Sequence, residues 1–269
     1  MWSDKELDIL KTYTGNSSIE TLLPNRTLLS IRQKAHRQGY TSIENQKTAS
    51  RARMLGSNQN RKYTFNDRAF SEISNESCYW AGFIAADGCI TYNRGSLVFS
   101  FGLQASDVVA VEQLRAFLQH TGPIVNSIKQ TFLSKCIAIF RCTQIAHDLE
   151  VIYNITPRKS LTLQPPNLTN PEHIKSFIVG YIDGDGCIMQ KPTHIELNVI
   201  GTKQVMYWIK NFFDLTYAGK TNQTIRSANR IYSYSVCGKR ALLILQDLKT
   251  TYTGTLARKW NKLILEPIL

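Results

Sequence analysis

The sequence lacks the cysteine patterns that bind zinc or build a disulfide framework. Its six cysteines include no Cys-x-x-Cys pair, and no group of cysteines and histidines has the spacing of a zinc site. No apolar run approaches the ~18–20 residues that a transmembrane helix needs. The first ten residues, MWSDKELDIL, contain acids and no apolar signal-peptide core. We therefore expect reduced cysteines in a protein core, a cytoplasmic location and no membrane partner.

Acidic residues are scarce relative to basic ones. The 269 residues include 20 Asp and Glu against 32 Lys and Arg, which gives a net charge of +12 and a pI of about 9.5. Such a balance favours a polyanionic partner, and nucleic acid before a membrane surface. Hydrophobic residues make up 43% of the chain, so it can bury a sizeable core.

Residues 1–45 read as a small helical domain. Ser3 or Asp4 can cap a first helix with Glu6 at its third position, a short helix follows, and Thr27 can cap a third, basic helix. Three such helices suit a helix-turn-helix DNA reader or, alternatively, a small bundle with a solvated charged face. The DNA-binding candidates in the third helix are Ser30, Arg32, Gln33, Lys34 and Arg37.

Residues 46–68 form a polar, basic stretch that we interpret as a linker. It has little apolar surface to bury, and it either lies along DNA phosphates or is a solvated tether. The DNA-binding candidates in this stretch are Arg51, Arg53, Arg61 and Lys62.

The rest of the chain is a duplication, residues 69–166 and 167–269. The stretch CYWAGFIAADGCI at 78–90 is matched by FIVGYIDGDGCIM at 177–189, so that Asp87 and Asp185 are 98 residues apart. After each Asp-Gly come alternating, strand-like residues, an amphipathic helix, two more strands and another helix. Each half thus predicts the order α-β-β-α-β-β-α, and the constant spacing over about 100 residues indicates an internal repeat.

Each repeated stretch predicts a buried helix that ends at an acid. Small residues stand four apart at Gly82 and Ala86 and at Gly180 and Gly184, so two such helices can cross closely. Crossing near a pseudo-two-fold axis would place Asp87 beside Asp185. Two carboxylates at helix C-termini repel each other and face the negative ends of the helix dipoles, and divalent cations such as Mg²⁺ would relieve both penalties. We also expect the glycine after each acid, Gly88 and Gly186, to provide the flexible φ needed to turn from helix into strand.

These residues resemble the LAGLIDADG homing endonucleases in their single-chain, two-motif form. WAGFIAADG at 80–88 matches one motif and IVGYIDGDG at 178–186 matches the other, and the resemblance covers residues 69–269. It implies an α+β fold of two pseudo-symmetric αββαββα repeats that form a saddle on DNA. The N-terminal domain more loosely resembles the Myb-like or homeodomain-like helix-turn-helix appendages of phage and mobile-element nucleases, which suggests a bacterial or phage-infected host.

The resemblance also implies site residues. The metal-binding acids would be Asp87 and Asp185, and the main chains of Ala86 and Gly184 would lend oxygen atoms to two or three Mg²⁺ ions, with Mn²⁺ as a substitute. The polar residues at the ends of second strands are Gln104 and Thr202, and the late basic residues are Lys159 and Lys259, with Arg158 and Arg258 as alternatives. The family motif usually has an acid at the position of Ala85. The second repeat keeps an acid there, Asp183, and the first repeat does not.

The expected activity is site-specific cleavage of both DNA strands across the minor groove, leaving short 3′ overhangs, by a monomer that needs no protein partner. This is the chemistry of intron homing and mobile genetic elements. Strand side chains would read the major groove. The candidates are Ser96, Ser100, Lys129, Gln130, Arg141, Asn198, Asn222, Gln223, Thr224, Arg226, Arg230 and Tyr232. Two alternatives use the same scaffold, a DNA-binding regulator without catalysis and an intron RNA maturase.

Overall fold

The computed structural model describes residues 2–11, 19–38, 63–93, 96–127, 135–140, 142–219, 223–252 and 254–263. These residues belong to two compact units, 1–62 and 63–269. Residues 63–68 pack in the second unit, because the Thr64 amide donates to Thr121 Oγ1 at 2.9 Å and Phe65 contacts the hydrophobic core. The expected linker of 46–68 therefore stops before residue 63, and its remainder lies outside the described residues.

The described part of the first unit consists of the helices α1 (Asp4–Lys11), α2 (Ile19–Leu22) and α3 (Leu28–Arg37). Ser3 and Glu6 form the expected capping box: the Glu6 amide donates to Ser3 Oγ at 3.3 Å, and the Ser3 amide donates to Glu6 Oε2 at 2.7 Å. At α3 the Ser30 amide donates to Thr27 Oγ1 at 3.3 Å, so the predicted cap is confirmed. The three helices share a small core made by Leu10, Ile19, Leu23, Ile31 and Ala35.

The second unit has the predicted αββαββα order twice. The first repeat contains α5 (Asn75–Asp87), β1 (Gly88–Asn93), β2 (Ser96–Gln104), α6 (Val108–Phe117), β3 (Val125–Ser127), β4 (Lys135–Phe140) and α7 (Thr143–Tyr153). The second contains α8 (Pro171–Asp185), β5 (Gly186–Gln190), β6 (Ile195–Gly201), α9 (Lys203–Thr216), β7 (Arg226–Ala228), β8 (Ile231–Cys237), α10 (Gly238–Thr251) and the short α11 (Ala257–Trp260). Both sheets are antiparallel, in the matching orders β1-β2-β4-β3 and β5-β6-β8-β7.

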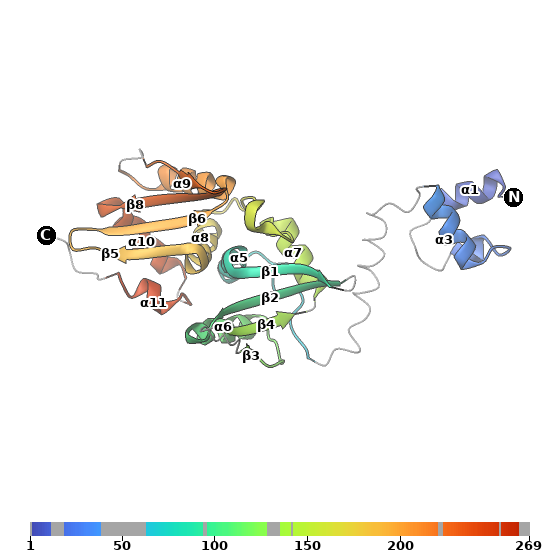
Figure 1. Ribbon diagram of the computed structural model, residues 1–269, viewed down its shortest axis with the longest axis horizontal. Coiled ribbons are helices and arrows are strands. Elements are labelled where there is room, and N and C mark those ends of the chain that lie inside the picture. The colour runs from blue at the N-terminus through green and yellow to red at the C-terminus, as the bar shows by residue number, and fades with distance from the viewer. Residues whose placement is uncertain are drawn as a thin grey trace. The chain divides into compact units, whose positions relative to one another are not determined.

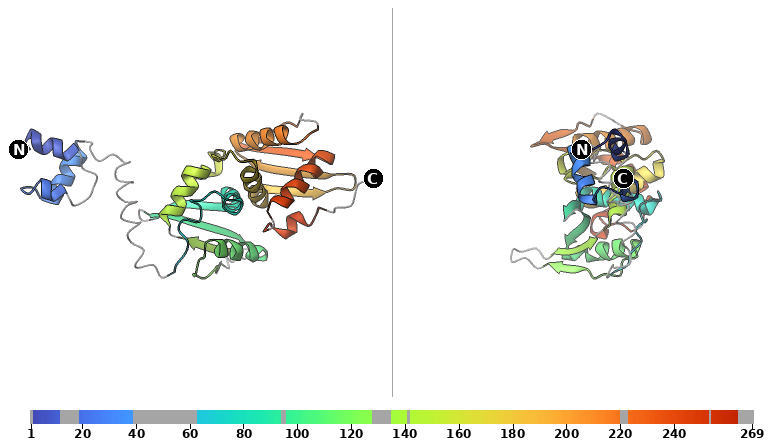
Figure 2. Two further views of the ribbon diagram at one scale, coloured as in Figure 1. Left: turned by 180° about the vertical axis from the view of Figure 1, so that it is seen from behind. Right: turned by 90° about the vertical axis from the view of Figure 1, so that its right-hand side faces the viewer.

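The helices α5 and α8 lie side by side between the two sheets, as Figure 1 shows. Helices α6 and α7 contact the first sheet, and α9 and α10 cover one face of the second (Figure 2). The other face of the second sheet carries the more exposed alternate side chains of β6. None of the helices in the described ranges is long and apolar enough to cross a bilayer.

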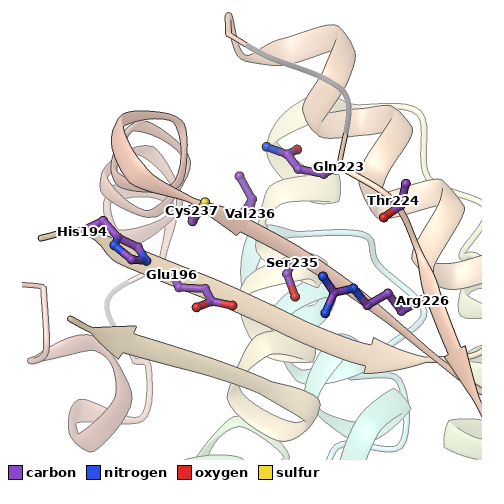
Figure 3. A pocket seen from close by; sticks show the side chains of 8 residues that line it. All are labelled: His194, Glu196, Gln223, Thr224, Arg226, Ser235, Val236 and Cys237. Atoms are coloured by element: carbon purple, nitrogen blue, oxygen red, sulfur yellow. The ribbon is translucent and has the colours of Figure 1, made fainter.

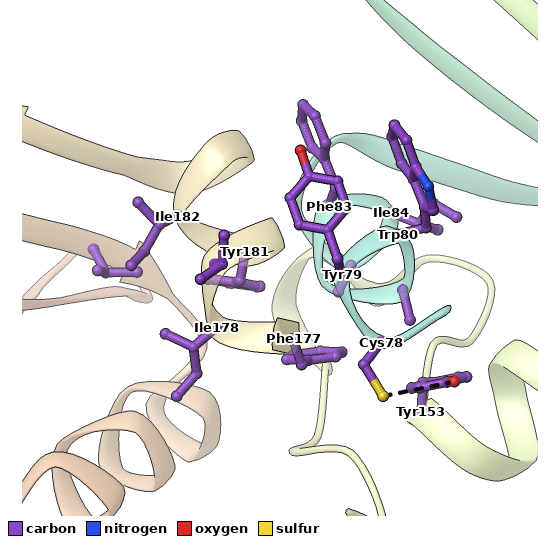
Figure 4. Close-up of a cluster of buried hydrophobic side chains, with 14 of the residues drawn as sticks. Cys78, Tyr79, Trp80, Phe83, Ile84, Tyr153, Phe177, Ile178, Tyr181 and Ile182 are labelled. Atoms are coloured by element: carbon purple, nitrogen blue, oxygen red, sulfur yellow. Dashed lines mark hydrogen bonds between the residues drawn. The ribbon is translucent and has the colours of Figure 1, made fainter. Parts of the chain in front are cut away.

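The crossing of α5 and α8 depends on glycine, as predicted. A Cβ atom at Gly82 would overlap the carbonyl oxygen of Phe177, and one at Gly180 would overlap the carbonyl oxygen of Tyr79. Aromatic and branched side chains of both helices surround this contact and are buried (Figure 4). The interface therefore combines direct backbone contact with a dry apolar rim.

Glycine is needed after the two acids, but backbone flexibility, which we expected to be the reason, is not the cause. Gly88 and Gly186 have φ of −75° and −100°, which other residues adopt readily. Space makes glycine necessary there. A Cβ atom would lie 2.7 Å from the carbonyl oxygen of Ile84 at the first position and 2.6 Å from that of Ile182 at the second. Each strand thus leaves its helix by folding tightly against the helix's own last turn.

Candidate active site

The crossing brings the C-terminal ends of α5 and α8 together, and with them Asp87 and Asp185. Oδ2 of Asp87 lies 3.2 Å from where a Cβ of Gly184 would be, so the first acid reaches the end of the second motif helix. The Asp87 side chain is exposed, and that of Asp185 is half-buried. The structure thus places one acid from each repeat at a single, partly open site.

Both acids have raised pKa values. Burial, and then the charge of Asp87, raises the pKa of Asp185 to about 6. Partial burial of its carboxyl group also raises the pKa of Asp87, while Lys259 and Lys159 oppose the shift. At neutral pH two carboxylates therefore carry negative charge at a place that disfavours it. This is the electrostatic condition under which a cation binds.

The two predicted lysines are buried and lie at the same helix ends. Nζ of Lys159 donates to the carbonyl oxygens of Ala85 at 2.6 Å and Ala86 at 3.0 Å, in the last turn of α5. Nζ of Lys259 approaches four carbonyl oxygens, those of Ile182, Asp183, Gly184 and Gly186, at 2.6–3.0 Å. Each ammonium group therefore satisfies helix-terminal carbonyls and places positive charge where the helix dipole is negative.

Among the positive charges near each acid, the lysine of the other repeat lowers its pKa most. Lys259 is the strongest of the charges that lower the pKa of Asp87, and Lys159 is the strongest of those that lower the pKa of Asp185. Burial in turn lowers the pKa of both lysines, and the two acids oppose that shift. The four groups form one electrostatic cluster at the repeat interface, so neither repeat holds a complete site by itself.

The departure at Ala85 makes the two motif ends chemically unequal. Its counterpart Asp183 is 1% exposed and accepts hydrogen bonds from Tyr79 Oη at 2.8 Å, from the Leu256 amide at 3.0 Å and from Trp260 Nε1 at 2.7 Å. Leu256 and Trp260 bracket α11, which carries Lys259. Asp183 is thus a structural anchor that holds the α11 segment.

The two polar residues at the strand ends differ in their settings. Gln104 is exposed at the end of β2, three residues before Asp107, which precedes α6. Thr202 is 4% exposed; its Oγ1 donates to the carbonyl oxygen of Leu163 at 2.7 Å and accepts from the Val205 amide at 3.4 Å. Thr202 is therefore the N-cap of α9, and its hydroxyl is already engaged.

A hollow of about 210 Å³ opens beside Asp185. Its walls come from both repeats, because Lys159 and Ala86 face Asp185 and Thr202 across it. Tyr181 also lines this hollow and donates from its hydroxyl to the carbonyl oxygen of Ile200 at 3.1 Å. The space is large enough for several water molecules or a phosphate group.

The open face of the second sheet presents the other predicted candidates. Asn198 of β6 lies opposite Ser235 of β8, and its Nδ2 donates to Ser235 Oγ at 2.5 Å. Glu196 and Arg226 border a hollow of about 350 Å³ on this face, and Gln223 and Thr224 lie on its rim (Figure 3). The residues that line this hollow are His194, Glu196, Gln223, Thr224, Arg226, Ser235, Val236 and Cys237.

The structure contradicts the assignment of Tyr232 to the DNA-binding face. Tyr232 has the same strand parity as Tyr234 and Val236, whose side chains are buried, and its ring packs partly against the hydrophobic core. Arg230 is exposed in the turn before β8, with φ of 69°. Ser100 lies half-buried in β2 opposite Cys89, on the face away from buried Phe99 and Phe101.

Several candidates cannot be assigned contacts. Ser96 and Arg32 lie in β2 and α3, but their side chains are not among those described. On α3 the side chains of Gln33 and Arg37 are exposed, and those of Ser30 and Lys34 are half-exposed. The candidates outside the described residues are Arg51, Arg53, Arg61, Lys62, Lys129, Gln130, Arg141 and Asn222.

Sequence reasoning missed two functional candidates. The first is Asp107, a buried acid that pairs with Arg258 across the repeats. Asp107 stands 20 residues after Asp87, and the residue 20 positions after Asp185 is Val205. An acid in one repeat with no equivalent in the other could have indicated this candidate from the sequence. The second is Glu196, an acid on the otherwise neutral or basic face of the second sheet, where its strand parity with Asn198 could have indicated it.

The donor set fits a divalent cation in part. Two carboxylates with water and phosphate oxygens suit Mg²⁺, which takes few protein ligands. The described residues contain no group of three or more His, Cys, Asp or Glu side chains arranged for a metal. The carbonyl oxygens of Ala86 and Gly184 already accept hydrogen bonds from Lys159 and Lys259, so they are weaker candidates than the carboxylates.

Paired acids at the ends of two crossing helices, between two matching antiparallel sheets, define a pseudo-symmetric α+β protein with one composite site. No protein-family profile and no curated protein matches the sequence. Among solved structures, the chain is similar to LAGLIDADG homing endonucleases. One is the LAGLIDADG meganuclease I-AabMI bound to uncleaved DNA, with 15% identity, coverage of 69% of this chain and 87% of that chain, and a TM-score of 0.44.

Two further structures are similar to this chain. The LAGLIDADG homing endonuclease I-LtrWI bound to target DNA has 12% identity, coverage of 67% and 85%, and a TM-score of 0.45. I-SmaMI bound to an uncleaved DNA target in the presence of calcium ions has 12% identity, coverage of 72% and 86%, and a TM-score of 0.36. The similarity is one of fold, so the role of each residue depends on this chain's own geometry.

Proposed function

We propose that this protein is a LAGLIDADG homing endonuclease, a site-specific enzyme that cuts both strands of double-stranded DNA. The observation that carries the proposal is the composite site. Asp87 and Asp185, one from each repeat, converge at two helix ends beside Lys159 and Lys259, which are buried. An arrangement selected for stability alone would not place two repelling carboxylates there.

In this proposal Asp87 and Asp185 hold Mg²⁺, or Mn²⁺ in its place, in a site of two or three ions. When bound, the ions supply an activated water and stabilise the charge that develops on the scissile phosphates. Lys159 and Lys259 each bind carbonyl oxygens at the end of the motif helix of their own repeat, and they would hold positive charge within reach of the same phosphates. Gln104 is exposed at the end of β2, and in this proposal its amide orients a water molecule.

Double-stranded DNA is the proposed partner, and the net charge of +12 favours it. The open faces of the two sheets would lie in the major groove, where Asn198, Arg226 and Glu196 can meet base edges. The two acids would then cut the two strands across the minor groove and leave short 3′ overhangs. The exposed face of α3 would add phosphate contacts outside this core site.

A cut-site selection tests the proposal. The purified full chain is incubated with Mg²⁺ and a plasmid library of random inserts, and the new DNA ends are sequenced. Asp87→Asn and Asp185→Asn proteins are treated in the same way, and Asp8→Asn, at an exposed acid of the first unit, is the matched control. We expect staggered cuts at one sequence with the wild-type and Asp8→Asn proteins, and none with the other two.

Three other outcomes would contradict the proposal. Cuts that persist in both site variants would come from a contaminating nuclease. Tight sequence-specific DNA binding without cutting would instead indicate a regulator. Selective binding of an intron RNA with no cutting of DNA would indicate a maturase.

A further inference from the structure

An ion pair between the two repeats lies next to the composite site. Asp107, which precedes α6 of the first repeat, is 6% exposed and accepts two hydrogen bonds from Arg258 of α11 in the second repeat. Arg258 Nε donates to Oδ1 at 2.8 Å, and Nη2 donates to Oδ2 at 2.7 Å. This two-pronged geometry fixes the orientation of both groups more strongly than a single contact would.

The pair holds a segment that matters for the site. Arg258 is followed directly by Lys259, whose Nζ binds the last carbonyls of α8. Asp183 anchors the same segment from the second repeat, through the Leu256 amide and Trp260 Nε1. The α11 segment is therefore fixed from both sides, by an acid of its own repeat and by Asp107 of the other repeat.

The charges of the pair act on one of the two acids and not on the other. The charges of Arg258 and Asp107 both act on the Asp87 carboxylate, together with Lys259 and Lys159. The carboxylate of Asp185 is influenced instead by Asp87, Lys159 and Lys259. Asp107 also follows Gln104 by three residues, and Asp87, Gln104 and Asp107 all belong to the first repeat.

The other half of the site has no equivalent pair. The position that corresponds to Asp107 in the second repeat is Val205, which is buried in the core. Arg158, the counterpart of Arg258, forms no ion pair with any acid in the described parts of the chain. The two halves of the site are thus supported in different ways.

We propose that Asp107 is a positioning residue for one half of the active site: through Arg258 it holds α11, and with it Lys259, beside Asp87. The inference rests on the proposed function, because it concerns the cutting of one strand relative to the other. Loss of the pair lets α11 shift, and a displacement of about 1 Å at a reacting group can slow a reaction about 100-fold. The strand served by Asp87 is then cut more slowly, and nicked DNA accumulates.

The test measures the cutting rate of each strand separately. A supercoiled plasmid that carries the selected target is cut by the wild-type, Asp107→Asn and Arg258→Gln proteins, and each strand is labelled at one end. Asp214→Asn is the matched control, because Asp214 pairs with Arg240 at 2.7 Å within the second repeat. Gln104→Ala identifies the strand that depends on the Asp87 half of the site.

We expect Asp107→Asn and Arg258→Gln to slow that same strand about 10-fold to 100-fold more than the other. The double variant should show no greater strand bias than either single variant, since both remove one interaction. Asp214→Asn should leave the ratio of the two rates unchanged. Hydrogen exchange at residues 256–260 should be faster in Asp107→Asn than in Asp214→Asn, which shows that the α11 segment itself has loosened.

If Asp107→Asn leaves the ratio of the two strand-cutting rates unchanged, whether both rates fall equally or neither falls, the inference is overturned and the proposed function stays intact. A bias toward the strand that Gln104→Ala leaves unaffected would overturn it as well. If the wild-type protein cuts neither strand of any target, the proposed function fails first, and the inference fails with it.

Discussion

Replacing Asp185 with asparagine is expected to stabilise the metal-free protein at pH 7.5, although it removes an acid from the proposed site. The pKa of Asp185 is raised from 3.8 to about 6 by burial and by the charge of Asp87. A folded-state pKa above the unfolded value means that the folded protein prefers the protonated acid. The stability that this preference contributes is complete below pH 3.8 and is lost as the pH rises through 6.

The magnitude follows from the size of that shift. About two pKa units correspond to about 3 kcal/mol in the free energy of unfolding. The carboxylate is half-buried, so solvent screening reduces this, and we expect a gain of about 1–2 kcal/mol for Asp185→Asn. The gain should vanish near pH 4, where the wild-type acid is protonated and resembles the amide.

Urea unfolding in the presence of a chelator, at pH values from 4 to 8, measures this difference. Asp247→Asn is the matched control, because the pKa of Asp247 is shifted in the opposite direction. Burial by itself would raise the pKa of Asp247, but hydrogen bonds from Tyr217 and Lys175 lower it below 3.8. That variant should be less stable than the wild type at pH 7.5. If Asp185→Asn is destabilising at pH 7.5, or its gain is the same at pH 4, the reasoning about repelling carboxylates is wrong.

Four other predictions concern packing, capping, base recognition and the first unit. Gly180→Ala should lower the free energy of unfolding by more than about 4 kcal/mol in urea titrations, because its Cβ would overlap the Tyr79 carbonyl; an effect below about 1 kcal/mol would contradict the crossing. Lys259→Met should cost about 2–3 kcal/mol in the same assay, since the buried carbonyl oxygens around its Nζ lose the three N–H donors that they share. Glu196→Gln should relax a preference for cytosine at one position of the selected target, because a carboxylate accepts from the cytosine amino group; an unchanged profile would place Glu196 away from the bases. A chain that starts at residue 63 should cut the same site but bind it more weakly, with a shallower salt dependence in binding titrations; loss of all specificity would show that the first unit selects the target.

The elements that the sequence predicts are those with strong local signals. The order of helices and strands in both repeats, the caps at Ser3 and Thr27 and the close crossing at Gly82 and Gly180 follow from periodicity, capping chemistry and small-residue spacing. The reason for Gly88 was mistaken, because a local pattern cannot show that the strand folds back against Ile84. Tyr232 was misassigned although it alternates with Ser233 and Ser235 along β8 and shares the face of the buried Tyr234 and Val236.

The sequence by itself determined that two equivalent acids follow two equivalent buried helices, because a repeat of about 100 residues fixes the order of elements and the position of each acid within them. Only the tertiary structure decided which groups surround those acids. Asp107 and Arg258 are 151 residues apart, and the positive charge that most lowers the pKa of Asp87 and of Asp185 is in each case the lysine of the other repeat. Such contacts arise when two folded halves pack together, and no local property of either segment encodes them.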